Sequence, residues 1–245
     1  MLRPRWPDGT DIVRANSGRW EIGGVSALPD LLRGLDLTGV FANALLGGSV
    51  ARTKNFDPVG FAALAIVSGL GGGIIRDTLL QRGTPVALTD YPYLLTALGG
   101  AAVAFAVPFE GRVWDRAFPF VDALALGCWA AAGAQKTLLL GLGSLAAVLL
   151  GTVTAVGGGV VRDLCVGRIP TIFGGNTLYA TCALLASAVM VGMQRAGLPG
   201  LGLVVATVVG AGLCLIARWR GWILPERIDL RRRRRKNHSR GGDRP

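Results

Sequence analysis

The chain has 245 residues, of which 51% are hydrophobic and 17% are charged, and its net charge is +11. A soluble domain of this size has about 25% charged residues, and the apolar stretches lack the alternation of strands and amphipathic helices that a soluble α/β fold requires. No aromatic residues interleave with the basic run near the C-terminus, as a surface for single-stranded nucleic acid would need. Composition and charge therefore favour an all-α membrane protein and argue against a nucleic-acid partner.

The first segment, residues 1–28, mixes basic with acidic side chains and has no long apolar run. We interpret it as a loosely ordered arm outside the membrane.

Seven apolar stretches follow the arm. Five of them contain no Asp, Glu, Lys or Arg, and each can hold the roughly 17–25 residues that cross a bilayer as a helix. Two shorter stretches, 37–51 and 123–135, lie next to Asp36 and Asp122. The sequence predicts seven transmembrane helices, near residues 30–50, 57–80, 91–109, 117–135, 138–164, 174–194 and 198–218.

The last segment, residues 219–245, is strongly basic and includes Arg231 to Arg235 and Lys236. Basic flanks stay cytoplasmic, so seven spans place the N-terminus outside and the C-terminus in the cytoplasm, in a multi-pass protein of the cell (inner) membrane. We expect a disordered tail that contacts anionic lipid headgroups, each basic residue contributing roughly 1 kcal/mol near the surface.

A twelve-residue motif occurs twice, 86 residues apart. Residues 71–82 read GGGIIRDTLLQR and residues 157–168 read GGGVVRDLCVGR, so six of the twelve positions are identical. The same offset pairs Asp36 with Asp122 and aligns two tyrosines, at positions 93 and 179. Each copy contains three predicted spans, and an odd number of crossings reverses the second copy. We therefore predict two inverted three-helix repeats, residues 29–115 and 116–196, and an unpaired seventh helix at 197–218.

The glycine triplets lie inside apolar spans. Each Gly costs about 1 kcal/mol relative to Ala in a helix, so three in a row predict a point where the helix kinks or opens. Freed backbone groups survive in a membrane only against protein or a water-filled cavity, although small residues also permit close helix packing. We expect two broken helices that meet near the midplane and line one polar pathway, with the break at Gly71, Gly72, Gly73, Gly157, Gly158 and Gly159.

Charged residues follow each triplet. Adjacent residues on a helix do not face each other, and a charge at the bilayer centre costs at least about 2.5–3.5 kcal/mol. We therefore expect each arginine to meet an acid on another helix or water in a cavity, or to anchor a helix end at the headgroups. The polar residues associated with the pathway are Arg76, Asp77, Arg162, Asp163, Asp36 and Asp122.

The doubled GGGxxRD motif in two three-helix repeats, with a seventh helix and a basic tail, resembles the prokaryotic trimeric intracellular cation (TRIC) channel family. The same repeat unit is also catalogued as a glycine-transporter domain, and the resemblance covers about residues 30–218. It implies a homotrimer with one pore in each subunit, lined by the two Gly-kinked helices. It also implies passive permeation of potassium and other monovalent cations.

Two other functions stay open on the residues alone. A secondary transporter of glycine or another small amino acid would use exposed helix N-termini and an arginine to bind a carboxylate. A membrane scaffold without transport is the third hypothesis. The internal acids and bases nearly cancel, so the sign of the permeant ion comes from the resemblance and not from the charges.

No residues suggest catalysis. His238 is the single histidine and lies in the tail, and the four cysteines show no CxxC spacing. We expect no enzymatic activity, no cofactor and no metal site, and we expect the four cysteines to be buried, reduced thiols.

Overall fold

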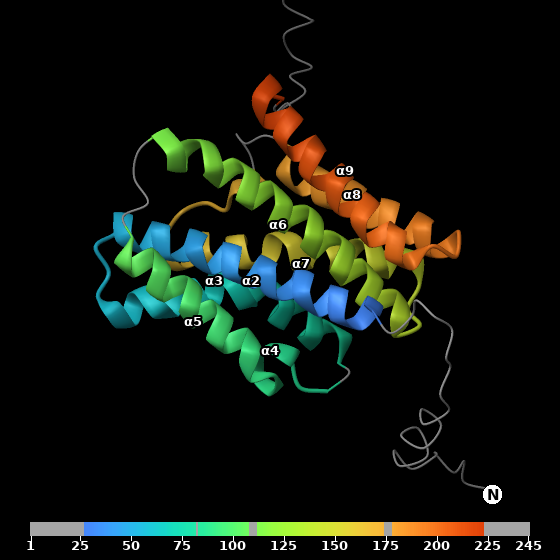
Figure 1. Ribbon diagram of the computed structural model, residues 1–245, viewed down its shortest axis with the longest axis horizontal. Helices are drawn as coiled ribbons and strands as arrows, with labels where there is room; N and C mark the ends of the chain where they lie inside the picture. The colour runs from blue at the N-terminus through green and yellow to red at the C-terminus, as the bar shows by residue number, and fades with distance from the viewer. Residues whose placement is uncertain (1–26, 82, 108–111, 174–177, 223–245) are drawn as a thin grey trace, which may run out of the picture.

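The computed structural model describes residues 27–81, 83–107, 112–173 and 178–222, and these residues form an all-helical bundle (Figure 1). The predicted arm lies almost wholly outside the described residues, as does the basic tail after residue 222. The described helices are α2 (Ala27–Thr53), α3 (Pro58–Leu80), α4 (Val86–Thr89), α5 (Tyr91–Ala106), α6 (Arg112–Leu139), α7 (Ser144–Cys165), the 3₁₀ turn η2 (Thr171–Phe173), α8 (Tyr179–Arg195) and α9 (Pro199–Arg220).

The long helices occupy the ranges that the hydropathy pattern predicted, with differences at their ends. Helix α6 begins at Arg112 and not near residue 117, although it contains Pro119. Pro119 is the eighth residue of the helix, so it removes one backbone hydrogen bond inside α6. The residues before it include Arg112, Asp115 and Arg116, so hydropathy alone placed the boundary too late.

Local sequence signals fix the ends of α3. The Asp57 side chain accepts a hydrogen bond of 2.7 Å from the backbone N–H of Gly60, and Pro58 occupies the first turn. An acidic cap followed by proline is a strong start signal for a helix. The helix ends where Gln81 adopts a left-handed conformation with a φ of 50°. The twelve-residue motif therefore lies at the C-terminal end of one continuous helix.

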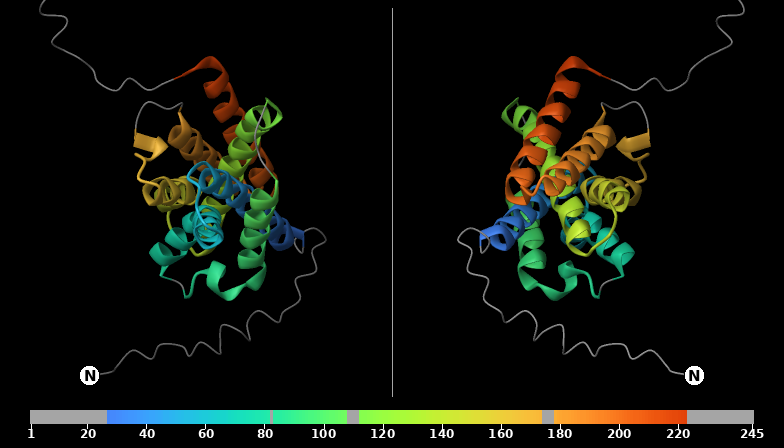
Figure 2. Two further views of the ribbon diagram at one scale, coloured as in Figure 1. Left: turned by 90° about the vertical axis from the view of Figure 1, so that its left-hand side faces the viewer. Right: turned by 90° about the vertical axis from the view of Figure 1, so that its right-hand side faces the viewer.

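The helices pack as two groups of three with α9 at one side. Helices α2, α3 and α5 contact one another, and α6, α7 and α8 do the same, while α3 also packs on α7 and α2 on α6. Helix α9 packs on α6 and α8. In both views of Figure 2, α8 and α9 lie on the opposite side of the bundle from α4 and α5.

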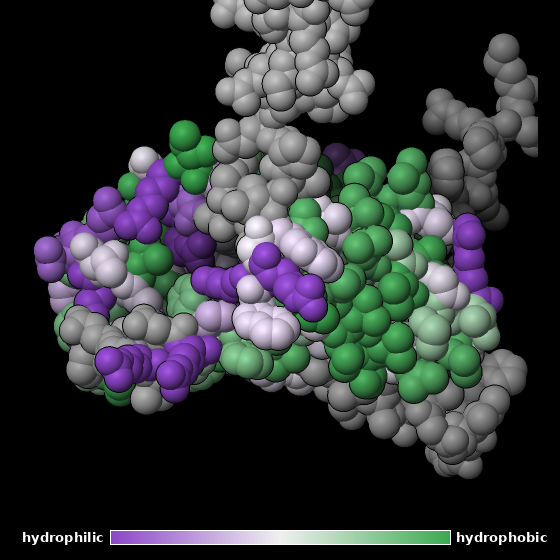
Figure 3. All heavy atoms as spheres, turned by 90° about the horizontal axis from the view of Figure 1, so that it is seen from above, coloured by the Kyte–Doolittle hydropathy of each residue, from purple (hydrophilic) through white to green (hydrophobic). Residues whose placement is uncertain are grey.

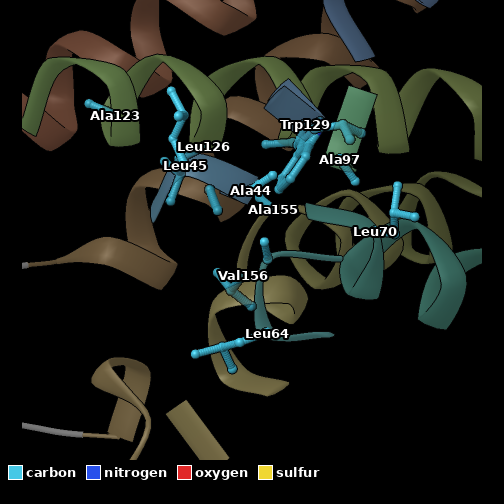
Figure 4. Packing of buried hydrophobic residues seen from close by; sticks show 14 of the residues in the cluster. Ala44, Leu45, Leu64, Leu70, Ala97, Ala123, Leu126, Trp129, Ala155 and Val156 are labelled. Carbon is cyan, nitrogen blue, oxygen red and sulfur yellow. The ribbon is translucent and has the colours of Figure 1, made fainter. Parts of the chain in front are cut away.

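The core between the two groups is built largely from small residues. Figure 4 shows Trp129 and Leu126 of α6 beside Ala44 and Leu45 of α2, with residues of α3 and α7 below them. Many of the buried core positions are alanines with almost no exposed surface, including Ala44. Small side chains let helix backbones approach closely, which is how helices associate in membranes.

The outer surface is apolar over a wide area. Figure 3 shows a broad hydrophobic region on one face and hydrophilic residues toward one end. Large apolar side chains on α9 are exposed at helical spacing, among them Leu201, Val204 and Val208. Within the described residues, four helices are long and apolar enough to cross a membrane: α3, Arg116–Leu139 within α6, α7 and α9, while α5 is apolar but shorter. These features are those of a membrane protein.

Candidate functional site

The two glycine triplets meet where α3 crosses α7. A Cβ atom on Gly72 would overlap the backbone carbonyl of Thr154, and a Cβ on Gly158 would overlap the backbone carbonyl of Ser68. A Cβ on Gly157 would lie 3.0 Å from the Cα of Gly72. The second glycine of each triplet therefore permits backbone-to-backbone contact between the two helices, which we call the glycine crossing.

The expected break in these helices is not seen. Helices α3 and α7 continue as α-helix through both triplets, from Pro58 to Leu80 and from Ser144 to Cys165. The glycines instead remove side-chain bulk at the crossing, which is the packing alternative that their size allowed. The cost in helix propensity is offset by the close contact with the other helix.

The third glycine of each triplet has a different environment. A Cβ on Gly73 would have only the Arg76 guanidinium nearby, at 3.8 Å, and a Cβ on Gly159 only the Arg162 guanidinium, at 3.6 Å. Both glycines line cavities. Each triplet thus provides one glycine for the crossing and one for a cavity wall.

The first of these cavities, here called the Asp36 cavity, lies beside the C-terminal end of α3. Its main part has a volume of about 330 Å³, and a narrow part of about 20 Å³ shares Asp36, Arg76 and Tyr93 with it and reaches Gly73 and Thr154. The charged and aromatic residues that line the main part are Arg33, Asp36, Arg76, Asp90, Tyr93 and Lys136. The cavity therefore extends from exposed residues toward the glycine crossing.

The second cavity, here called the Asp122 cavity, has a volume of about 240 Å³ and is built from the other three-helix group and α9. It includes Val156 and Gly159 of α7 and Val50 at the end of α2. Its charged and aromatic lining residues are Phe118, Asp122, Arg162, Asp163, Arg168, Tyr179 and Arg218. Four polar positions of the first cavity recur here at the offset of 86: Asp36, Arg76, Asp77 and Tyr93 correspond to Asp122, Arg162, Asp163 and Tyr179.

Each cavity contains a tyrosine bound to an aspartate. The Tyr93 hydroxyl donates to Asp36 Oδ2 at 2.8 Å, and the Tyr179 hydroxyl donates to Asp122 Oδ1 at 2.9 Å. Among the described residues, neither aspartate forms an ion pair with a basic side chain. Sequence reasoning did not assign the tyrosines to the site, although their alignment at the repeat offset was the signal that could have done so.

Each arginine pairs with the aspartate that follows it in the chain. Arg76 Nε lies 2.8 Å from Asp77 Oδ1, and an Arg162 Nη lies 3.0 Å from Asp163 Oδ1. The expectation that the arginines would pair with acids on other helices is therefore wrong. The arginine side chain is long and flexible enough to fold back to its neighbour, so the charge is neutralised within one helix and needs no partner across the bundle.

Asp77 has further donors from outside α3. Lys136 Nζ of α6 donates to Asp77 Oδ1 at 2.8 Å, and the backbone N–H of Val86 donates to Asp77 Oδ2 at 3.1 Å. Lys136 thus links the two three-helix groups through an ion pair. The sequence had shown Lys136 only as one of the internal charges.

The cysteines depart from expectation at one position. Cys128, Cys182 and Cys214 are buried, whereas Cys165 at the end of α7 is exposed. Helix α7 leaves the apolar core at this point, and Gly167 ends it with a positive φ of 67°. The described residues contain no group of three or more His, Cys, Asp or Glu side chains that could hold a metal ion.

Both halves of the chain match one family model. The model described as glycine transporter matches residues 33–108 and again 119–195. A UPF0126 membrane protein of Deinococcus radiodurans is 36% identical over 209 residues, which is 84% of this chain and 94% of that protein. The UPF0126 inner membrane protein YadS of Escherichia coli K12 is 31% identical over 152 residues, covering 62% of this chain and 73% of YadS.

Solved structures of TRIC channels have a similar fold. A TRIC cation channel studied for its conductance has a TM-score of 0.72 and 30% identity, over 79% of this chain and 95% of that chain. The trimeric intracellular cation channel orthologue from Rhodobacter sphaeroides has a TM-score of 0.73 and 31% identity, over 78% of this chain and 98% of that one. The repeated motif, the family match and the shared fold lead to one assignment: the chain belongs to the glycine-transporter (UPF0126) family of membrane proteins, a prokaryotic family with the TRIC channel fold.

Proposed function

We propose that the protein is a passive, potassium-permeable channel for monovalent cations, with one pore in each subunit. The pore runs from the Asp36 cavity past the glycine crossing to the Asp122 cavity. The observation on which this proposal depends is the pair of repeat-related polar cavities that approach the same crossing from opposite ends of α3 and α7. The fold shared with TRIC cation channels supports the same function.

The cavities have the chemistry that a cation pathway needs. Charged side chains inside a membrane protein line ion or substrate pathways or pair with one another. The four motif residues Arg76, Asp77, Arg162 and Asp163 pair within their own helices. This leaves Asp36 and Asp122 as the carboxylates that attract cations, each oriented by a tyrosine hydroxyl.

The glycine crossing is the narrowest part of the proposed pore. Ser68 and Thr154 lie at equivalent positions beside it, and the Ser68 hydroxyl is buried without a hydrogen-bond partner. Polar groups of this kind can replace part of the water shell of a passing ion. Permeation by this route needs no catalysis, cofactor or bound metal.

The proposed assembly is a homotrimer of seven-span subunits made of two inverted three-helix repeats. Arg168 and Arg218 line the Asp122 cavity with Val50, Arg52 follows Val50 in the chain, and Arg218 directly precedes the basic tail in the sequence. Basic residues flank the cytoplasmic side of membrane helices. The Asp122 cavity then faces the cytoplasm, the N-terminus lies outside, and the basic tail contacts anionic lipid headgroups.

Conductance of purified protein in planar bilayers tests the proposal. We expect steady unitary potassium currents without a coupling ion. Gly73→Leu and Gly159→Leu should each reduce the current at least tenfold, because a leucine side chain would extend into a cavity without meeting backbone atoms. Gly212→Leu is the matched control, since a Cβ at this glycine of α9 has no neighbour within 4 Å and Gly212 lines neither cavity.

The outcomes separate clearly. Folded wild-type protein that carries no current would end the channel proposal. If Gly73→Leu and Gly159→Leu both carry currents as large as those of the wild type, ions pass by another route.

A carrier for a zwitterionic amino acid is the second candidate. The Asp36 cavity holds both signs of charge, with Arg33 and Lys136 beside Asp36 and Asp90, which would suit the carboxylate and the ammonium group of glycine. Saturable uptake of glycine into proteoliposomes, without unitary currents, would favour the carrier.

A further inference from the structure

Several cavity charges have no counterpart in the other half: Lys136, Arg33, Asp90 and Arg218. Lys136 on α6 lines the Asp36 cavity and lies 2.8 Å from Asp77. The residue 86 positions earlier is Val50 on α2, which lines the Asp122 cavity together with Asp163. The two helices thus contribute equivalent positions to the two cavities, but only one of them provides a cation.

Asp77 is neutralised without Lys136. Its carboxylate already accepts from Arg76 Nε at 2.8 Å and from the N–H of Val86 at 3.1 Å. In the other half, the Arg162–Asp163 pair forms beside a valine at the equivalent position. Lys136 is therefore an additional positive charge and not the partner that makes the arginine–aspartate pair possible.

The ammonium group lies at a boundary between protein and open cavity. The side chain of Lys136 is 34% exposed, whereas those of Arg76 and Asp77 are 4% and 8% exposed. An ion that enters the Asp36 cavity therefore meets the charge of Lys136 with water around it, while the Arg76–Asp77 pair lines the cavity wall with little of its surface exposed.

We propose that Lys136 is a fixed cation at the mouth of the Asp36 cavity that slows the entry of permeant cations from that side of the membrane. Val50 brings no charge to the other mouth, where Arg168 and Arg218 provide positive charge. The unequal residues at this repeat position therefore contribute to a preferred direction of current. This inference rests on the channel function proposed above and adds to it a residue that contributes to sidedness.

Simple electrostatics gives the size of the effect. One unit charge about 6 Å from an ion in water changes the local ion concentration about threefold. The Debye length falls from about 10 Å at 0.1 M salt to about 3 Å at 1 M, so the effect should fade at high salt.

The test is a charge exchange between the two repeat positions, measured as current–voltage curves in symmetric KCl. Lys136→Met keeps the length of the side chain and removes its charge, and it should raise the current that enters from the Asp36 side about threefold at 0.1 M and much less at 1 M. Val50→Lys should lower the current that enters from the Asp122 side by a similar factor. The double variant K136V/V50K should shift the rectification toward the opposite direction.

Two controls make the result specific. Lys136→Arg keeps the charge and should conduct like the wild type, and labelling of the exposed Cys165 by a membrane-impermeant maleimide reports how the protein is oriented. The inference is wrong if Lys136→Met and Lys136→Arg change the current equally, or if the double variant rectifies as strongly in the original direction as the wild type does. If Lys136→Met does not fold, Val50→Lys still tests the inference, because unchanged currents in that variant are enough to overturn it. Absence of current in the wild type removes this inference together with the channel proposal.

Discussion

Two aspartate–tyrosine pairs are the most direct residue-level link between the sequence repeat and the cavities. Tyr93 donates a hydrogen bond of 2.8 Å to Asp36, and Tyr179 donates one of 2.9 Å to Asp122. The hydroxyl orients the carboxyl group in each cavity by donating to one of its oxygens.

At this scale we expect Asp36→Asn and Asp122→Asn to lower the permeability ratio of potassium to chloride. Each loss should be roughly threefold at 0.1 M salt, the effect of one unit charge about 6 Å from the ion in water. Reversal potentials in a KCl gradient measure the ratio.

Asp57→Asn is the matched control. Asp57 caps α3 from an exposed position outside both cavities, and asparagine caps a helix about as well as aspartate. An equal change of selectivity in Asp57→Asn would mean that overall charge, and not the cavity carboxylates, controls the ratio.

The residue-level predictions from the sequence were partly right. The offset of 86 correctly aligned Asp36 with Asp122 and the two tyrosines, because a repeated fold places repeated residues in equivalent environments. The predicted partners of the arginines were wrong. Helical spacing gives the position of each Cβ atom, but it does not give the position of the guanidinium group at the end of a flexible side chain. Lys136 could not be placed, because its partner Asp77 lies 59 residues away on another helix.

At the scale of the helices, the glycine crossing connects the two halves. Helices α3 and α7 are continuous through their glycine triplets, and contact there is between backbones. The sequence showed that the triplets mattered but did not distinguish a broken helix from a close contact, because both demand small residues.

Gly72→Ala tests this contact. The added methyl group would overlap the carbonyl of Thr154, and we expect the variant to unfold at lower temperature, with a loss of about 1–3 kcal/mol that is typical of an overpacked core. Thermal unfolding in detergent, followed by helical circular dichroism, measures the loss.

Gly99→Ala provides the comparison, because a Cβ at Gly99 on α5 has no neighbour within 4 Å. That variant should match or exceed the wild type, since alanine favours helix by about 1 kcal/mol over glycine. A Gly72→Ala protein as stable as Gly99→Ala would show that the helices can separate at the crossing without cost.

At the scale of the whole molecule, the cavities point to the two ends of the bundle. Val86 and Tyr93, near α4, line the Asp36 cavity, whereas Arg168 and Arg218 line the Asp122 cavity. Hydropathy predicted the approximate positions of the long helices well, because membrane helices must be long and apolar. It gave no information on cavity volume, which depends on how the side chains of several helices pack.

The proposed orientation can be checked by labelling in whole cells. Leu88 on α4 is exposed near the Asp36 cavity, and Leu88→Cys should react with an impermeant maleimide added outside. Cys165 should react only after the membrane is permeabilised. Labelling of Cys165 alone from outside would reverse the orientation, and labelling of both would contradict the inverted arrangement of the two halves.

Close backbone contact at the glycine crossing has a mechanical consequence for helices α3 and α7. No side chains interlock where Gly72 meets Gly158. We therefore expect the two helices to rotate relative to each other about this contact more easily than they slide along each other. Such a rotation would separate the two helices at both ends at once. The glycine crossing would stay narrow while the Asp36 cavity and the Asp122 cavity widen.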